Sequence, residues 1–472
     1  MTQIRILFIC LFLSVKGFSQ RNAQQKLDSV FSMMYAQHQF NGTVLIEEGG
    51  KIIFSKAYGH RDTLSKHKNT QETIYELASC SKQFTAAAIL LLHRKGMLQY
   101  EDSLTKFIPE LSVWKGVRIY DLLRHTSGIP EYIADMQNGW DRRKIATNDD
   151  LIRFYSSRKD TLLFAPGSKH RYCNTNYALL ATIAERVSGL GFAELLKEYI
   201  FSPLNMKNTF VYNHRQHPQK IKNRATGYVW KKNSFDKITS ENPNYGDSLV
   251  FYLDGIVGNA KVNSTVNDIY KWITALKNNS FFTPEEFGLM TAITKTPAGK
   301  SVSYGFGLEL SGGNNNLSFG HTGSWDGYTT FIYHNMRKNR TIIILQNFNL
   351  GANPYQTINQ ILDNKPINIE YPKKIELPFA EIEKFAGYYT DEANKAEQQE
   401  ITFLNGYLVH NSSKVKWDMR FFPIAKDQFQ GIRQGGADAV LKFTDMENGD
   451  TKLEMLQYGK VIGTSVKKNK HN

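Results

Sequence analysis

A serine and a lysine three residues apart, Ser79 and Lys82, stand where a strongly apolar helical pattern begins. Residues i and i+3 of a helix share a face, so the Lys82 amine is expected to reach the Ser79 hydroxyl. A serine becomes a good nucleophile only when a base takes its proton, and a lysine kept neutral by burial can be that base. The pair is therefore a candidate for acyl transfer through a covalent serine intermediate.

The Ser-x-x-Lys spacing alone is weak evidence, because it recurs along this chain. Its eight occurrences begin at Ser65, Ser79, Ser103, Ser112, Ser156, Ser234, Ser413 and Ser465. Ser103 and Ser413 lie in polar or loop-like sequence, whereas Ser79 opens a helical pattern with a natural stop at Gly96. The apolar stripe of that helix is Phe84, Ala87, Ala88, Leu91 and Leu92. This context favours Ser79 as the nucleophile.

A second element, Tyr172-Cys173-Asn174, directly precedes another amphipathic helical pattern. A tyrosine held near a lysine is expected to have a depressed pKa and to relay protons between nucleophile and leaving group. The asparagine amide can donate to a substrate carbonyl. A Tyr-x-Asn triplet recurs at Tyr333 and Asn335, so the triplet is informative only together with Ser79.

A third element is His321-Thr322-Gly323, in a strand pattern that ends in glycine-rich sequence. The glycine would let a substrate lie against the strand. His321 and Thr322 could then bind an anionic or polar group of that substrate, although a lone histidine is more often structural.

Strand patterns open and close the region that carries the three elements, and helical patterns lie between them. The expected strands lie in residues 42–58, folded as a hairpin at Gly49-Gly50, and in 303–311, 317–323, 328–335 and 340–348. This order predicts an α+β fold with an antiparallel sheet flanked by helices, its first and last strands adjacent, and a helical subdomain.

Four segments follow from the composition along the chain. Residues 1–19 have a basic start, an apolar run too short to span a membrane, and small residues at Gly17 and Ser19, as in a cleaved export signal. Residues 20–361 form the predicted main domain, and 362–374 a proline-containing linker. Residues 375–472 carry short strand patterns and are predicted to form a small β-rich domain. We expect a periplasmic or secreted protein that is not transmembrane after cleavage.

The net charge of +14 falls to +12 (14 − 2) when Arg5 and Lys16 leave with the signal. This surplus could favour an anionic cell-envelope surface, although lysines scattered over a solvated surface are the commoner cause. No basic block interleaved with aromatic residues predicts nucleic-acid binding, and no His/Cys spacing predicts a metal ion. The two cysteines outside the signal, Cys80 and Cys173, are too few for a disulfide-built fold; a bond between them is conceivable.

Taken in order, the three elements resemble the serine β-lactamase and penicillin-binding protein superfamily, in particular the class C β-lactamase-like branch with D,D-peptidases and esterases. Ser79-x-x-Lys82 matches the first family motif and Tyr172-x-Asn174 the second, while His321-Thr322-Gly323 replaces Lys-Thr-Gly. The likeness covers about residues 25–350 and includes the stretches LLRHTSGIP, NYALLATIAERVSG, FSPLNMKNT and YGFGL.

The resemblance implies that Ser79 is acylated and that Lys82 and Tyr172 share the proton transfers, with the general base left open. It implies an oxyanion hole formed by the backbone N–H groups of Ser79 and Ser324. Asn174 would then orient the acyl side of the substrate. His321, Thr322 and Gly323 would face its carboxylate, and no cofactor is implied.

Histidine in place of lysine at 321 is charged only part of the time near neutral pH. This favours a D,D-carboxypeptidase-like or esterase-like serine hydrolase over an efficient β-lactamase. The expected substrate is a D-Ala-D-Ala-type peptide, an ester or a β-lactam. The alternatives are a β-lactamase and a non-catalytic protein that binds penicillin-like ligands.

Overall fold

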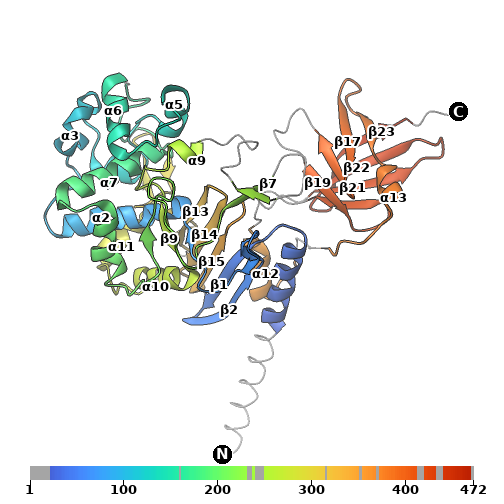
Figure 1. Cartoon of the computed structure of the whole chain (residues 1–472), viewed down its shortest axis with the longest axis horizontal. Helices are drawn as coiled ribbons and strands as arrows, with labels where there is room; N and C mark the ends of the chain where they lie inside the picture. The colour runs from blue at the N-terminus through green and yellow to red at the C-terminus, as the bar shows by residue number, and fades with distance from the viewer. Residues whose placement is uncertain are drawn as a thin grey trace, which may run out of the picture. The chain divides into compact units, whose positions relative to one another are not determined.

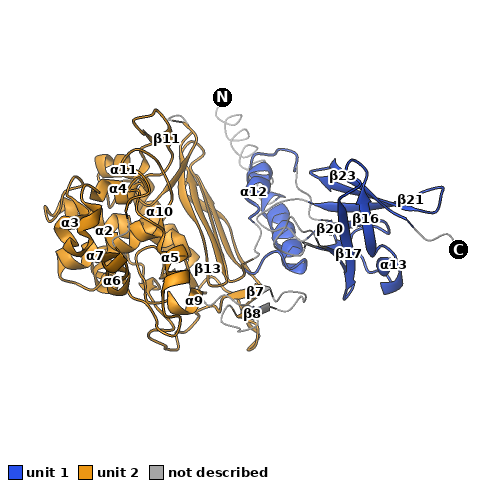
Figure 2. Cartoon of the chain, turned by 90° about the horizontal axis from the view of Figure 1, so that it is seen from above, with its two compact units in different colours: residues 1–41, 230–238, 350–472 blue, residues 42–229, 239–349 orange. Residues whose placement is uncertain are grey.

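The computed structural model describes residues 22–158, 161–230, 237–239, 249–313, 316–349, 353–367, 372–411, 419–431 and 439–468. The chain divides into two compact units, drawn in different colours in Figure 2. One comprises residues 42–229 and 239–349 and contains all three sequence elements. The other comprises residues 1–41, 230–238 and 350–472.

The larger unit is built on a six-stranded sheet with the order β12-β13-β14-β15-β1-β2 (Figure 1). Its strands are β1 Gly42–Glu48, β2 Lys51–Tyr58, β12 Glu309–Ser311, β13 Ser318–Trp325, β14 Tyr328–Asn335 and β15 Arg340–Gln346. All neighbours pair antiparallel, and the first strand lies beside the last, from Gly42 opposite Gln346 to Glu48 opposite Arg340. The predicted α+β class, the sheet and the adjacency of its first and last strands are confirmed.

Helices and short strands fill the chain between β2 and β12. The helices are η1 Ala78–Ser81, α2 Lys82–Arg94, α3 Leu104–Phe107, η2 Pro109–Trp114, α4 Ile119–Leu123, α5 Tyr132–Gly139, α6 Asn148–Arg158, α7 Asn174–Ser188, α8 Phe192–Leu196, η3 Lys197–Phe201, α9 Leu249–Tyr252, α10 Val266–Lys277 and α11 Pro284–Thr291. The short strands are β3 His60–Asp62, β4 His67–Lys68, β5 Tyr75–Glu76, β6 Phe210–Val211, β7 Tyr228–Trp230, β8 Lys237–Thr239, β9 Val262–Ser264, β10 Thr294–Lys295 and β11 Ser301–Val302.

Helix α2 runs through the hydrophobic core of this unit. Every residue from Lys82 to Leu92 is buried, so the helix is enclosed on all sides and not only along the predicted stripe. The small side chains of Ala86, Ala87 and Ala88 allow neighbouring elements to approach closely, and α7 packs against α2. Gly96 follows the helix with φ +73°, a conformation that glycine adopts without strain. The helix therefore holds its first residue, Lys82, in a fixed and dry position.

The smaller unit contains a helix over residues 22–36, α12 Tyr355–Leu362 and α13 Phe379–Glu383. Its eight remaining strands close into an antiparallel barrel: β16 Gly387–Asp391, β17 Gln398–Leu404, β18 Tyr407–Asn411, β19 Met419–Pro423, β20 Gln428–Gly431, β21 Val440–Asp445, β22 Thr451–Gln457 and β23 Lys460–Lys467. The predicted β-rich C-terminal region is confirmed. Strand β19 is not evident from the sequence, because it ends in Pro423 and shows no clear alternation.

The predicted signal at 1–19 lies outside the described residues, as do 368–371 of the predicted linker. The boundaries at 361 and 375 stay predictions. Over the part of the chain that the structure describes, none of the helices combines the length and apolar character needed to cross a bilayer.

Candidate active site

Ser79 lies in the 3-10 turn η1, three residues before α2 begins at Lys82. The turn begins at Ala78, a buried residue with φ +49°, which costs free energy for a side chain other than glycine. The Thr330 hydroxyl donates to the Leu77 carbonyl at 2.8 Å and holds the entry to the turn. Ser79 is half-buried between buried neighbours, so its hydroxyl remains accessible.

Lys82 points its amine at the Ser79 hydroxyl, with 3.0 Å between Nζ and Oγ. Its side chain is fully buried. The same nitrogen donates to Asn174 Oδ1 at 2.8 Å and to the Asn259 carbonyl at 2.9 Å. Burial lowers the pKa of Lys82 to about 7, although the nearby Glu131 carboxylate opposes this change. A substantial fraction of Lys82 is therefore neutral near pH 7 and able to take a proton from Ser79.

Tyr172 lies beside both groups, with its ring centroid 5.0 Å from Lys82 Nζ. About a third of its side chain is exposed, but its hydroxyl is enclosed by protein and hydrogen-bonded to Ser79. Burial raises the pKa of Tyr172 well above its usual value, with the bond to Ser79 acting in the opposite direction. The expectation of a depressed tyrosine pKa is therefore wrong, because loss of water around the phenol outweighs its hydrogen bond to Ser79. Tyr172 keeps its phenol proton at neutral pH, and these pKa directions favour Lys82 over Tyr172 as the base, which stays a prediction.

Asn174 is the first residue of α7, and its amide bridges two groups of the site. Its Oδ1 accepts from Lys82, while its Nδ2 donates to Glu131 Oε2 at 3.2 Å. The Glu131 carboxylate also accepts the Asn174 backbone N–H at 2.7 Å and caps α5 through Ile133. These bonds make Asn174 a positioning group for Lys82; its predicted contact with the acyl side of a substrate stays a prediction. Sequence reasoning missed Glu131, although it follows the stretch HTSGIP directly.

His125 is a second residue that the sequence reasoning missed. It is fully buried, has φ +57°, and its ring centroid lies 4.3 Å from that of Tyr172. Its Nδ1 accepts the backbone N–H of Cys173 at 3.2 Å, and its carbonyl accepts the N–H of Arg171 at 2.9 Å. Burial lowers its pKa well below the usual value, so the ring stays neutral. His125 therefore shapes the loop that presents Tyr172.

His321 of the third element faces the interior of the site, not solvent. Its Nε2 lies 2.9 Å from the Tyr304 hydroxyl, and its Nδ1 contacts the Thr322 carbonyl. A carbonyl only accepts, so Nδ1 carries the hydrogen and Nε2 accepts from Tyr304. Burial lowers the pKa of His321 to about 4, although the charge of Glu309 opposes this change. The imidazole is therefore neutral at physiological pH, more completely than the sequence suggested.

Strand β13 presents an open edge next to the nucleophile. The opposite edge of β13 pairs with β14. On the open edge, β12 pairs with β13 only at residues 318–320, so residues 321–325 have no strand partner there within the part of the chain that the structure describes. The β13–β14 hairpin turns at Asp326 (φ +52°) and Gly327 (φ +82°), a two-residue turn whose flanking pair is hydrogen-bonded. Because hydrogen-bonded and non-hydrogen-bonded pairs alternate, the Ser324 N–H points to the open edge. The register agrees with the predicted oxyanion role of Ser324, which remains to be tested.

Gly323 lies where β13 meets the nucleophile turn. A Cβ built on it would stand 2.4 Å from Thr330 Oγ1, 2.5 Å from the Leu77 carbonyl and 3.1 Å from the Ser79 backbone nitrogen. The absence of a side chain thus lets the strand approach Ser79, which explains the glycine of the third element.

We expect Gly323→Ala to slow covalent modification of Ser79 by about tenfold or more, since a displacement of this turn by even ~1 Å disturbs the reacting geometry. The apparent second-order rate with a fluorophosphonate measures this. Gly288→Ala is the matched control: Gly288 lies in α11 with nothing within 4 Å of an added Cβ. That variant should keep the rate and gain up to ~1 kcal/mol of stability. Equal rates in both variants would contradict the packing argument.

Cys80 and Cys173 are free and buried thiols. Cys80 Sγ donates to the His321 carbonyl at 3.0 Å, and Cys173 Sγ contacts the carbonyls of Ile129 and Pro130 at 3.4 Å. Burial raises the pKa of Cys173 to about 12, and that of Cys80 rises as well. The conceivable disulfide is therefore not formed, and both residues act as small core side chains.

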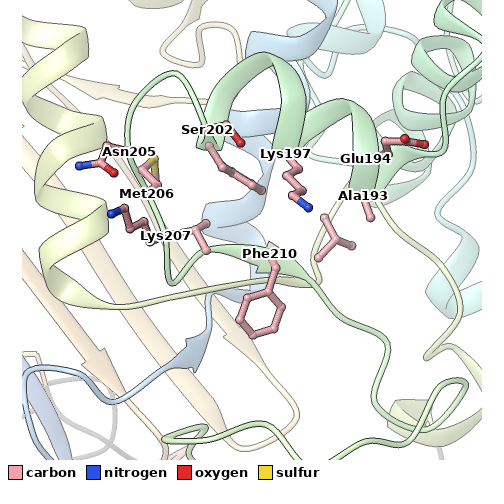
Figure 3. A pocket seen from close by; sticks show the side chains of 11 residues that line it. Ala193, Glu194, Lys197, Ser202, Asn205, Met206, Lys207 and Phe210 are labelled. Atoms are coloured by element: carbon pink, nitrogen blue, oxygen red, sulfur yellow. The ribbon is translucent and has the colours of Figure 1, made fainter.

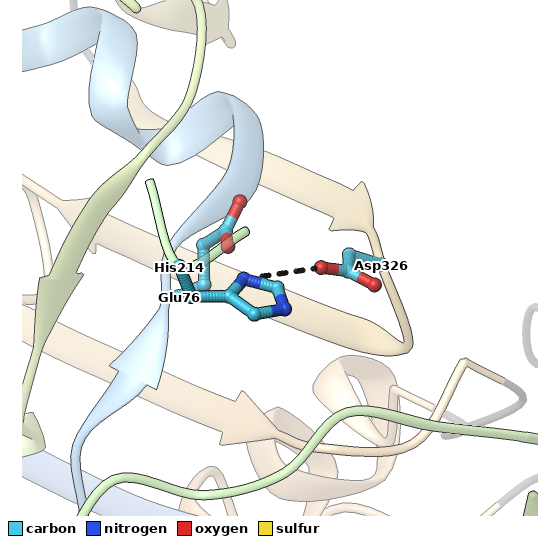
Figure 4. Close-up of side chains that lie close together, drawn as sticks. All are labelled: Glu76, His214 and Asp326. Atoms are coloured by element: carbon cyan, nitrogen blue, oxygen red, sulfur yellow. Dashed lines mark ion pairs between the residues drawn. The ribbon is translucent and has the colours of Figure 1, made fainter. Parts of the chain in front are cut away.

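A buried ionic cluster lies beneath the strand that leads to Ser79. Three of its members, Glu76, His214 and Asp326, have ligand atoms within 4.8 Å of one another, a geometry that could hold a metal ion (Figure 4). However, Lys261 Nζ lies 2.8 Å from Asp254 and 3.6 Å from Glu76. The Glu76 carboxylate of this group therefore already has a cationic side chain nearby.

Two arginines also lie close to carboxylates of this cluster. Arg215 makes two bonds of 2.8 Å to the Asp326 carboxylate, and Arg224 lies 3.8 Å from Glu76. Burial opposes ionisation of Asp254, but the charge and hydrogen bond of Lys261 bring its pKa to about 2. The cluster is thus a charge-balanced support for β5, which precedes the nucleophile turn.

We expect Lys261→Met to lower the free energy of unfolding by about 3–5 kcal/mol, because it leaves buried carboxylates without a close cation. Urea denaturation followed by circular dichroism measures the change. Arg143→Ala, which removes the exposed pair between Arg143 and Asp141, should leave the midpoint unchanged. A wild-type midpoint for Lys261→Met would show that the cluster does not support the fold.

A surface cavity of about 700 Å³ is lined by α8, η3, β6 and the chain between η3 and β6 (Figure 3). Its cations, Lys197 and Lys207, are exposed side chains. None of the residues predicted for chemistry lines it.

The α+β fold, a reachable serine hydroxyl and a buried, partly neutral lysine define this unit as that of a serine hydrolase. A family model described as Beta-lactamase matches residues 21–363. The chain is 34% identical over 391 residues to Penicillin-binding protein 4* of Bacillus subtilis, across 80% of this chain and 86% of that protein. The chain therefore belongs to the Beta-lactamase family.

Solved structures agree on the fold. The octameric penicillin-binding protein homologue from Pyrococcus abyssi superposes with a TM-score of 0.63 at 23% identity, covering 94% of this chain and 99% of that chain. The D-amino acid amidase from Ochrobactrum anthropi superposes with a TM-score of 0.57 at 22% identity, covering 73% of this chain and 96% of that chain. The first of these matches extends over nearly the whole chain, the barrel included.

Proposed function

We propose that this protein is an exported serine hydrolase that forms an acyl-enzyme on Ser79 and acts as a peptidase or esterase of the D,D-carboxypeptidase-related type. The observation that carries the proposal is the 3.0 Å contact between Ser79 Oγ and a fully buried Lys82 whose pKa is about 7. The relationship to Penicillin-binding protein 4* supports the same chemistry.

The first half-reaction forms the acyl-enzyme. Neutral Lys82 takes the Ser79 proton while Oγ bonds to the substrate carbonyl carbon, and the carbonyl electrons move onto oxygen. The N–H groups of Ser79 and Ser324 stabilise that oxyanion. When the intermediate collapses, the bond to the leaving group breaks, and the phenol of Tyr172 supplies the proton that the leaving group takes. A water molecule can then carry the proton of Lys82 to the Tyr172 phenolate, because the acylated Ser79 oxygen no longer carries a hydrogen.

The second half-reaction releases the acyl group. A water molecule gives its proton to neutral Lys82 and attacks the ester carbonyl, and Ser79 leaves with a proton from the same network. The product is a carboxylic acid, and the enzyme returns to its initial state. No group from outside the chain is needed for the balance of protons.

Intact-mass analysis after treatment with a fluorophosphonate tests the proposal, since this reagent reports an activated serine whatever the natural substrate is. One adduct on Ser79 is the expected result. A panel of D-Ala-D-Ala peptides, short-chain esters and β-lactams then separates peptidase, esterase and β-lactamase activity. Absence of any adduct would leave a non-catalytic penicillin-binding-like protein as the better description.

A further inference from the structure

The open edge of β13 determines how an extended substrate can lie in the site. A peptide that adds to this edge antiparallel to β13 places a carbonyl opposite the Ser324 N–H, and its C-terminal side then lies next to Thr322. The added peptide would run in the same direction as β12. Strand β12 pairs with the same edge of β13, where Glu309 lies opposite Gly320. The leaving group therefore approaches the first residue of β12, which is Glu309.

Glu309 occupies this position with a carboxylate held by two hydroxyl groups. The Thr322 hydroxyl donates to Oε1 at 3.0 Å, and the Tyr333 hydroxyl donates to Oε2. Its Oε1 also lies 3.6 Å from His321 Nδ1, and 31% of the side chain is exposed. No lysine or arginine forms an ion pair with it among the described residues. A negative charge without a cationic partner thus faces the space next to Thr322.

The side chains expected to bind a substrate carboxylate already hydrogen-bond to other groups of the protein. A hydroxyl has one hydrogen to donate, and that of Thr322 goes to Glu309. Both nitrogens of His321 are engaged, with Tyr304 and with the Thr322 carbonyl, and the ring is neutral. An anionic leaving group would therefore meet the like charge of Glu309, and neither the His321 nor the Thr322 side chain has a hydrogen left to donate to it.

We propose that Glu309 makes the leaving-group side of this site selective for a positively charged leaving group over one that carries a carboxylate. The inference rests on the proposed acylation of Ser79. Within the proposed function it favours a peptidase or esterase with a cationic leaving group over a carboxypeptidase, whose leaving amino acid carries a carboxylate. The net charge of +14 would by itself attract anions, so a preference for cations must arise locally.

The test uses three aryl phosphonate esters that differ only in the para substituent of the leaving phenol: carboxylate, carboxamide or trimethylammonium. Attack by Ser79 Oγ forms the bond to phosphorus and expels the phenoxide, so intact mass gives the rate without requiring turnover. In the wild type we expect the cationic ester to react fastest and the carboxylate slowest. The cation-to-anion rate ratio should fall by about tenfold or more in Glu309→Gln, which keeps an acceptor for Thr322.

The control Glu198→Gln removes the same charge from an exposed position of η3 and should keep the wild-type ratio. Raising the salt from about 0.02 M to about 0.5 M should also compress the wild-type ratio, which tests the charge without any mutation. The inference would be wrong if wild type and Glu309→Gln gave equal cation-to-anion rate ratios. It would also be wrong if the wild type preferred the carboxylate ester and salt did not alter that preference. Neither result would contradict the proposed acyl-enzyme. No modification by any of the three esters would overturn the proposed function itself.

Discussion

Replacing Ser79 with alanine should abolish the fluorophosphonate adduct and lower hydrolysis of any substrate by about a thousandfold or more, because among the described residues Ser79 supplies the one hydroxyl that Lys82 contacts by a hydrogen bond. The fold should be unaffected, since the Ser79 side chain is half-buried and Ala78 already determines the turn. Intact mass measures the adduct, and circular dichroism verifies folding.

Ser103→Ala is the matched control, because Ser103-x-x-Lys106 has the same spacing without the same surroundings. The Ser103 hydroxyl caps α3 by accepting the N–H of Thr105 at 3.3 Å. This variant should lose about 1 kcal/mol of stability and keep the full adduct. An adduct that still forms in Ser79→Ala would show that Ser79 is not the nucleophile.

Replacing Lys82 with alanine should slow acylation about 10²- to 10⁴-fold, the usual contribution of a positioned general base. The wild-type rate should rise as the pH increases through about 7 and level off above it, because only the neutral amine accepts the Ser79 proton and the pKa of Lys82 is about 7. Protonation of His321, whose pKa is about 4, falls well below this range and does not produce the rise. The acylation rate of the Lys82→Ala variant should not rise with pH in this range.

Lys106→Ala provides the control for this experiment. Lys106 is the lysine of the Ser103 sequence, is exposed, and pairs with Asp102 at 2.8 Å. Its removal should leave both the rate and the pH profile unchanged. A wild-type profile that is flat between pH of about 6 and about 9 would show that Lys82 is not the base.

The sequence motifs located the site because their physical meaning is local. Ser79 and Lys82 lie one turn apart whatever surrounds them, and the strand predicted at residues 328–335 has the same bounds as β14. The apolar helical pattern that follows Ser79 was also sufficient to favour Ser79 over Ser103 as the candidate nucleophile. These features depend on helix and strand periodicity, which the chain carries in its own order of residues.

Single polar residues without a motif escaped the sequence reasoning. Glu131, His125 and Glu309 are far from Ser79 along the chain, and each acts only through a partner supplied by another element. Nothing in their local sequence distinguishes them from solvated side chains. A search for polar residues inside the stretches HTSGIPEY and YGFGLEL is the one signal that could have found them.

The sequence by itself thus determined the α+β class, the strand order at the sheet centre and the β-rich C-terminal region, and it predicted the contact between Ser79 and Lys82. Only the tertiary structure decided the protonation states: the low pKa of Lys82, the raised pKa of Tyr172 and the neutral His321. It also placed the Glu309 carboxylate beside Thr322 and His321. The reason is physical: spacing along the chain sets which groups can touch, but the loss of water around each group, which sets its charge, depends on segments that folding brings together.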